Sequence, residues 1–234
     1  MSGRKLSHIV IVRFHYPKGD PRFEWRFDYF KLMVLPRLLN QTFQDFDIGI
    51  RCNPAHYRRF LELSPKIIPF TVTKEAEGYI RPEDRERAKP YGGEYFIDFV
   101  EWKDVVGLEK YDIQTGLDSD DLILQDDYLE FIQKKCQHAY RHSLHLSFIP
   151  FCFNLESLAL HHSATKYTPT HASPFMSLYQ PRKDDNFKFV YHDSHYKMGQ
   201  YAQKSITVPE GYVAFTVHHH NESSNMWMAG RKLP

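Results

Sequence analysis

The chain has 234 residues, of which 42% are hydrophobic and 25% charged, and its formal net charge is +1. This composition is typical of a globular protein and excludes a disordered chain, while the near-zero charge argues against a broad nucleic-acid-binding face. Chains of this length form one large domain or two small ones. Because no repeat or change of composition divides the sequence, we expect one domain over residues 1–234.

The cysteines and the N-terminal residues bear on the cellular compartment. The three cysteines, Cys52, Cys136 and Cys152, are widely spaced and form no Cys-x-x-Cys pair, which indicates a reducing compartment. The sequence contains no signal-peptide pattern and no apolar run of transmembrane length. We therefore expect a cytoplasmic protein that touches a membrane only through its acceptor or a partner.

Strand and helix patterns alternate through the first half of the chain. β-branched apolar runs predict strands, and apolar residues at helical spacing predict the helices between them. In chain order we predict a strand over 7–14, a helix over 23–40 that kinks or restarts at Pro36, a strand over 45–52, a helix over 56–63, an edge strand over 66–73 containing Pro69, a charged loop over 75–91, a helix over 96–109 and a strand over 111–117. This alternation predicts an α/β fold with a mainly parallel sheet and helices on both faces.

Strand pairs predominate in the second half. After a helix over 126–142, we predict a hairpin that turns at Asn154, a short helix over 175–179, and two late strands. The hairpin strands span 145–153 and 156–161, and the late strands span 187–192 and 210–220. This pattern predicts an antiparallel C-terminal extension of the sheet.

An acidic cluster follows the predicted strand 111–117. Asp118, Asp120 and Asp121 lie within four residues, where their charges repel one another unless water or a cation compensates them. Ligands of open α/β sheets bind at the carboxyl ends of strands, and Mg²⁺ or Mn²⁺ prefers carboxylates together with phosphate oxygens. The cluster alone fits such a metal site and equally a solvated turn that caps the next helix, with Asp126 as the N-cap.

Two segments resemble the GT-A glycosyltransferases. The segment PRLLNQTFQDFDIGI at 36–50 is similar to their N-terminal helix-to-strand signature, and TGLDSDD at 115–121 is similar to their Asp-x-Asp motif. A narrower resemblance, to a rhamnosyltransferase family, rests on the VRF sequence at 12–14, the LDSDD segment, and residues 173–178 and 218–221. The resemblance implies a nucleotide-binding half over 1–121 and an acceptor-binding half over 122–234.

The resemblance also implies an activity and roles for particular residues. It implies that Mn²⁺ or Mg²⁺ assists transfer from a UDP-, GDP- or dTDP-sugar to a glycan, a lipid-linked acceptor or another hydroxyl acceptor. Asp118 would face the ribose or the metal, and Asp120 would be the main metal ligand. Asp121, which we count among the catalytic residues, would hold a water or the donor sugar. Arg13, at the end of the first strand, would lie near the base or the diphosphate.

A late polar residue is expected to add a metal or phosphate contact. His218 or His220 fits this role because alternate positions of a strand share one face, although the same residues also fit a surface strand end. If the reaction inverts the anomeric centre, a carboxylate or histidine must take the acceptor's proton. The candidates are Asp184, Asp185, Asp193 and His195, and we favour Asp193 because it follows the predicted strand 187–192. A retaining enzyme would need no such base.

Two other functions remain open at this point. A sugar nucleotidyltransferase uses a similar sheet and an acidic metal site, but it usually carries a glycine- and basic-rich loop after the first strand, which HYPKGDPRF matches weakly. A catalytically silent carbohydrate-binding protein is the third hypothesis, and the intact acidic cluster argues against it.

Overall fold

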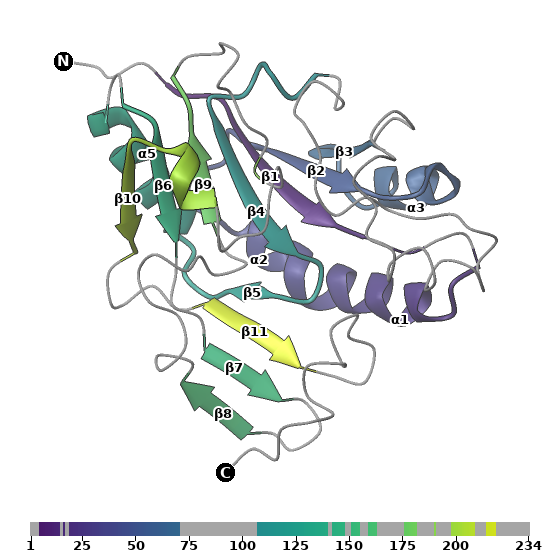
Figure 1. Ribbon diagram of the computed structural model, residues 1–234. Coiled ribbons are helices and arrows are strands. Elements are labelled where there is room, and N and C mark those ends of the chain that lie inside the picture. The colour runs from purple at the N-terminus through teal and green to yellow at the C-terminus, as the bar shows by residue number, and fades with distance from the viewer. Residues whose placement is uncertain are drawn as a thin grey trace.

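Two β-sheets organise the chain (Figure 1). The computed structural model describes residues 5–14, 16, 19–70, 107–139, 142–147, 151–154, 159–162, 176–181, 190, 198–208 and 214–218. Side by side, the strands of the seven-stranded sheet are β10 (Lys204–Thr207), β6 (Leu144–Ser147), β9 (Met176–Tyr179), β4 (Ile113–Asp118), β1 (His8–Arg13), β2 (Asp47–Arg51) and β3 (Ile67–Phe70). Those of the four-stranded sheet are β5 (Leu122–Ile123), β11 (Ala214–His218), β7 (Phe151–Asn154) and β8 (Ala159–His162).

Helices connect β1 to β2 and β2 to β3, as predicted. The long helical segment begins with α1 (Arg22–Tyr29), passes through a π-helical turn, η1 (Phe30–Val34), and restarts at Pro36 in α2 (Leu35–Leu39). Among the described residues, the other helices are η2 (Pro54–His56), α3 (Tyr57–Leu61), α5 (Tyr128–Ala139) and η6 (Met198–Tyr201). Pro36 is the second residue of α2, directly after the π-helical turn, and it has no N–H for a helical hydrogen bond, which agrees with the change of helix type there.

The centre of the large sheet is parallel. β1 pairs in parallel with β2 on one side and with β4 on the other, and β3 is the edge strand beyond β2. Gly49 of β2 suits this packing, because a Cβ there would lie 2.9 Å from Cδ1 of Ile9 and the end of that side chain would have to move. The predictions of a mainly parallel α/β sheet and of an edge strand around Pro69 are therefore confirmed.

An aromatic cluster joins α1 and α3 to the end of β1. Phe14 packs edge-on against Phe60 of α3, with ring centroids 4.8 Å apart, and against Phe30, at 5.3 Å. Phe23 and Phe27 lie on the same side of α1 and also contact Phe60. The apolar face of α1 is thus fixed toward α3 and the end of β1.

The short helix predicted over 175–179 is wrong, because Met176–Tyr179 is the strand β9. It pairs antiparallel with β4 and with β6, so it bridges the parallel centre of the sheet to its far edge. All four of its residues are buried. A strand covered on both faces shows no alternation of polar and apolar residues, so its sequence resembles a short buried helix.

Other predictions for the second half are partly corrected. The predicted strand 145–153 is two strands in different sheets, since β6 pairs with β9 and β10 whereas β7 pairs with β8 and β11. The β7–β8 and β4–β9 pairs are antiparallel, but β11–β7 and β10–β6 are parallel. Of the predicted helix 96–109, the last residues form a turn and 96–106 lie outside the described residues, as does 75–91. Within the predicted strand 187–192, the structure describes Val190 alone, in a turn.

His8 gives the fold a pH dependence. It is fully buried, and its Nε2 lies 2.8 Å from Oγ1 of Thr115. Burial lowers the pKa of His8 to about 3, so the folded protein keeps it neutral while the unfolded chain binds a proton below about pH 6.5. Above about pH 6.5, we expect His8 to have no effect on how stability changes with pH. As the pH falls from about 6.5 to 3, we expect His8 to reduce the free energy of unfolding by up to ~1.4 kcal/mol per pH unit.

Urea unfolding of the wild type and of His8→Gln at several pH values measures this effect. Glutamine is neutral throughout the range and retains a polar contact toward Thr115. The stability of the wild type is expected to fall more steeply on acidification than that of the variant. Equal slopes would mean that other groups cause the acid sensitivity.

Candidate active site

The carboxyl ends of β1 and β4 bring Arg13 and Asp118 together. The two residues are register partners at the ends of adjacent parallel strands. Nε of Arg13 donates to Oδ1 of Asp118 at 2.7 Å, and Nη2 lies 2.5 Å from the same oxygen. The side chain of Asp118 is 28% exposed, so this ion pair lies at the surface of the sheet's carboxyl edge.

The chain turns sharply after Asp118. The N–H of Asp121 donates to the carbonyl oxygen of Asp118 at 3.2 Å, and β5 begins at the next residue. We call residues 118–121 the acidic turn. Since β5 separates the acidic turn from α5, which begins at Tyr128, the acidic residues do not cap that helix, and the alternative of a helix cap is wrong.

A second arginine reaches the acidic turn from α1. Nη1 of Arg26 forms an ion pair with Oδ2 of Asp120, and both side chains are largely buried, at 4% and 11% exposure. Burial acts to lower the pKa of Arg26, but the negative charges around its guanidinium, with Asp120 the largest contributor, together raise this pKa above its ordinary value. The sequence analysis did not identify Arg26 as a site residue.

Two tyrosines accompany this buried pair. The guanidinium carbon of Arg26 lies 5.8 Å from the ring centroid of Tyr16, and that of Arg22 lies 5.7 Å from it. Burial raises the pKa of Tyr16 to about 12. Burial also raises the pKa of Tyr29, with a further contribution from the negative charges of Asp120 and Asp121. Arg22, Arg26 and Tyr29 recur at helical spacing on α1, and this polar stripe was the signal in the sequence that could have indicated their common face.

The smaller sheet carries His218 toward the acidic turn. β11 runs antiparallel to β5, and Phe215 pairs with Leu122, directly after the turn. Because β11 runs antiparallel to β5, its direction from Phe215 to His218, its last residue, is back toward the side of the turn. Asp193, His195, His220 and the pair Asp184-Asp185 lie outside the described residues.

The acidic turn has the donor chemistry of a Mg²⁺ or Mn²⁺ site. Within the described part of the chain, no three His, Cys, Asp or Glu side chains come together as metal ligands. Such ions are nevertheless commonly held by one or two carboxylates plus substrate phosphates. The hydrogen bond and the ion pair with Arg13 both involve Oδ1 of Asp118, so Oδ2 of this partly exposed carboxylate is the oxygen that would bind a cation. The carboxylates of Asp118 and Asp120 are therefore suitable ligands for Mg²⁺ or Mn²⁺, and Asp118 is the more exposed of the two.

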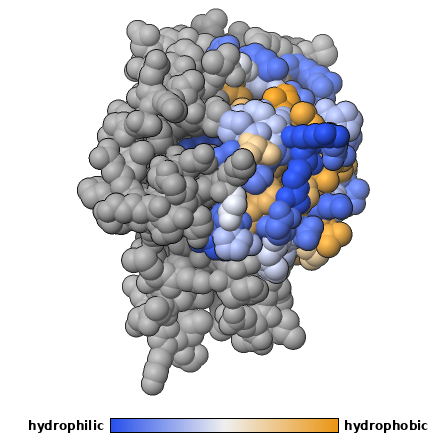
Figure 2. All heavy atoms as spheres, turned by 90° about the vertical axis from the view of Figure 1, so that its right-hand side faces the viewer, coloured by the Kyte–Doolittle hydropathy of each residue, from blue (hydrophilic) through white to orange (hydrophobic). Residues whose placement is uncertain are grey.

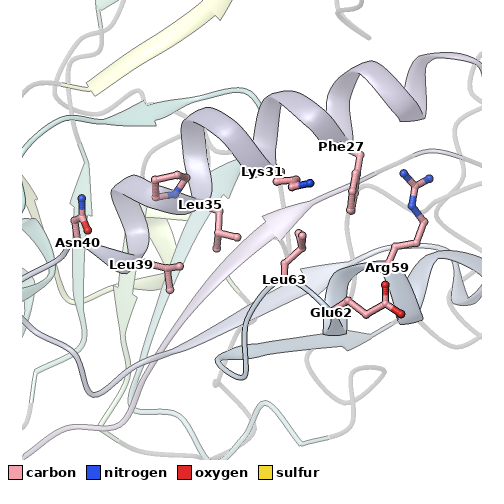
Figure 3. Close-up of a pocket in the computed structure, with 9 residues that line it drawn as sticks. Phe27, Lys31, Leu35, Leu39, Asn40, Arg59, Glu62 and Leu63 are labelled. Atoms are coloured by element: carbon pink, nitrogen blue, oxygen red, sulfur yellow. The ribbon is translucent and has the colours of Figure 1, made fainter.

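An open groove of about 640 Å³ lies away from these residues, between the α1–α2 segment and α3 (Figure 3). Phe27, Leu35 and Leu63 line it, with Lys31 and Arg59 among its polar residues, and none of the aspartates of the acidic turn does. The side of the molecule that carries α1 and α3 mixes hydrophobic and hydrophilic surface (Figure 2). The groove lacks clustered carboxylates or other reactive groups, so we place the candidate active site at the acidic turn.

Comparison with solved structures identifies the fold. The first 349 residues of S. aureus TarS superpose with a TM-score of 0.51 at 14% identity, over 91% of this chain and 60% of that one. A longer TarS structure gives 0.51 at 15% identity, over 91% and 37% of the two chains. The fold is of the GT-A type. GalNAc-T7, whose structure contains UDP, GalNAc and Mn²⁺, matches at a TM-score of 0.46 and 11% identity, over 92% of this chain and 44% of its own.

Sequence comparison adds no family assignment. No protein-family model matches the chain, and no curated protein matches it significantly. The chain spans between about a third and two thirds of the length of the structures that it resembles. Among the described residues, no helix combines the length and the apolar character needed to cross a bilayer.

Proposed function

We propose that the chain is a glycosyltransferase that moves a sugar from a nucleotide-diphosphosugar to a hydroxyl acceptor. The observation that carries this proposal is the acidic turn at the carboxyl end of β4, beside Arg13 of β1, in a GT-A fold. Ligands of open α/β sheets bind at this edge. The two carboxylates can bind a cation and accept a hydrogen bond from a ribose hydroxyl, and the guanidinium can bind a diphosphate.

The chemistry requires charge stabilisation at the leaving group. When the bond between the anomeric carbon and the diphosphate breaks, the diphosphate gains negative charge, which a cation or guanidinium must stabilise. Asp118 and Asp120 would hold Mn²⁺ or Mg²⁺, which supplies this stabilisation when bound. Arg13 is oriented by Asp118, and its guanidinium would bind the diphosphate or lie near the base. Asp121, buried at the end of the turn, would hold a water or the donor sugar.

The remaining assignments rest on the resemblance of the sequence. We propose His218 as a further metal or phosphate contact and Asp193 as the base of an inverting reaction, a role that the transfer rate of Asp193→Asn tests. Residues 1–121 would bind the nucleotide and 122–234 the acceptor. A rhamnosyl donor, a glycan or lipid-linked acceptor in polysaccharide biosynthesis, and a cytoplasmic location belong to the same proposal.

Calorimetry with UDP, GDP and dTDP, each with and without Mn²⁺, tests the function. We expect one nucleotide to bind at least about tenfold more tightly with the ion, because a divalent cation between carboxylates and a diphosphate screens their repulsion. Hydrolysis of the matching nucleotide-sugar would then identify the donor. Failure of all three nucleotides to bind with Mn²⁺ present would refute the proposal. Turnover of a nucleoside triphosphate with a sugar phosphate would instead assign a nucleotidyltransferase.

A further inference from the structure

The Arg26–Asp120 pair differs from the other ion pairs of α1 in its burial. The side chain of Arg26 is 4% exposed, and it extends from the middle of α1 to the acidic turn. By comparison, the side chain of Arg22, which pairs with Asp20, is 37% exposed. The side chain of Glu24, which pairs with Arg59, is 66% exposed. A buried guanidinium costs desolvation free energy that only a close carboxylate and further hydrogen bonds offset. Arg26 therefore has a fixed partner, and that partner is a predicted metal ligand.

The location of Arg26 also limits what it can do. A side chain this deeply buried, with the ring of Tyr16 next to its guanidinium, does not reach a diphosphate bound at the surface of the turn. Its charge nevertheless acts on any ion at Asp120, because interactions between charges are strong where water is excluded. Asp118 pairs with Arg13 and Asp120 pairs with Arg26, so each of these two carboxylates already has a cationic partner before a metal ion binds.

We infer that Arg26 is a built-in counter-ion that positions Asp120 and weakens the binding of a divalent cation to the acidic turn when no nucleotide is present. This inference rests on the proposed function. The turn keeps its shape without metal because Arg26 already compensates Asp120. A cation must then share Asp120 with a guanidinium, and it binds well only when a diphosphate supplies additional negative charge. Arg26 is thus a positioning residue and does not touch the substrate.

Titration of Mn²⁺ into the nucleotide-free protein, followed by electron paramagnetic resonance, tests this inference. In Arg26→Met, which keeps the apolar stem but removes the charge, we expect Mn²⁺ to bind at least about tenfold more tightly than in the wild type. Arg22→Met is the matched control, because it removes a charge from the same helix and the same tyrosine ring but leaves the acidic turn intact. We expect Arg22→Met to bind Mn²⁺ as tightly as the wild type does. Arg26→Lys keeps the positive charge, so its Mn²⁺ affinity is expected to remain close to that of the wild type.

The outcomes separate this inference from the proposed function. Mn²⁺ affinity in Arg26→Met equal to or below that of the wild type, including no binding by either protein, would overturn the inference. Failure of the wild type to bind any nucleotide with Mn²⁺ would instead overturn the proposed function. If Arg26→Met does not fold, the double variant Arg26→Met/Asp120→Asn decides: recovery of a cooperative thermal transition supports the pairing of the two charges, and its absence overturns it.

Discussion

Asp118→Asn is expected to lower kcat/KM for sugar transfer by at least about 100-fold, the size of effect that follows the loss of one preorganised electrostatic contact in a transition state. The amide has nearly the same shape as the carboxylate, but it carries no charge to attract a cation or to orient the guanidinium of Arg13. Because Asp118 is partly exposed, the variant should fold normally. Transfer assays with the donor found by calorimetry measure the loss, and circular dichroism verifies the fold.

Asp126→Asn is the matched control for this substitution. Asp126 is an exposed aspartate shortly before α5, outside the acidic turn, so the same charge is removed from a nearby position. We expect its activity to stay within about twofold of the wild type, as is usual for exposed residues without a special contact. The Mn²⁺ dependence of nucleotide binding should also disappear in Asp118→Asn alone. Normal transfer by Asp118→Asn would remove this residue from the active site.

The parallel centre of the sheet could be predicted because strand patterns alternate with a helical pattern along the chain. β1 is an apolar run and β2 contains β-branched residues, and a right-handed crossover between parallel strands follows from that alternation. The position of the acidic turn follows as well, since it ends the predicted strand 111–117. The prediction of these strands and of the acidic turn therefore depends only on local sequence patterns and on the general rules for connecting parallel strands.

The parts that could not be predicted depend on contacts between distant segments. Met176–Tyr179 forms a strand because β4 and β6 offer backbone partners on both sides, and nothing within its four residues indicates those partners. The contact of Arg26 with the acidic turn could not be predicted for the same reason. The spacing of Arg26 on α1 shows which residues share its face, but the sequence does not indicate that this face lies against the acidic turn, 94 positions away for Asp120. Long-range charge pairing is therefore what the structure adds to the site.

Asp120→Ala is expected to reduce the free energy of unfolding by about 3–5 kcal/mol, the usual cost of leaving a buried charge without its partner. In this variant the guanidinium of Arg26 stays buried against Tyr16 and loses the carboxylate that compensates it. Urea denaturation measures the change, and an unchanged m-value would show that the loss arises from stability and not from a different unfolded state.

Glu24→Ala gives the appropriate comparison, because Glu24 of α1 is the carboxylate partner of an arginine as well, Arg59 of α3. Glu24 receives two hydrogen bonds from Arg59, at 2.6 and 2.8 Å, but its side chain is 66% exposed. Water replaces the lost partner of an exposed arginine, so we expect this variant to lose at most about 1 kcal/mol. Similar losses of unfolding free energy in the two variants would show that water reaches Arg26 as easily as Arg59. The Arg26–Asp120 pair would then stabilise the acidic turn no more than an exposed ion pair does. A much larger loss for Asp120→Ala would mean that one carboxylate serves both the fold and the proposed metal site, so that activity lost in this variant cannot be attributed to catalysis alone.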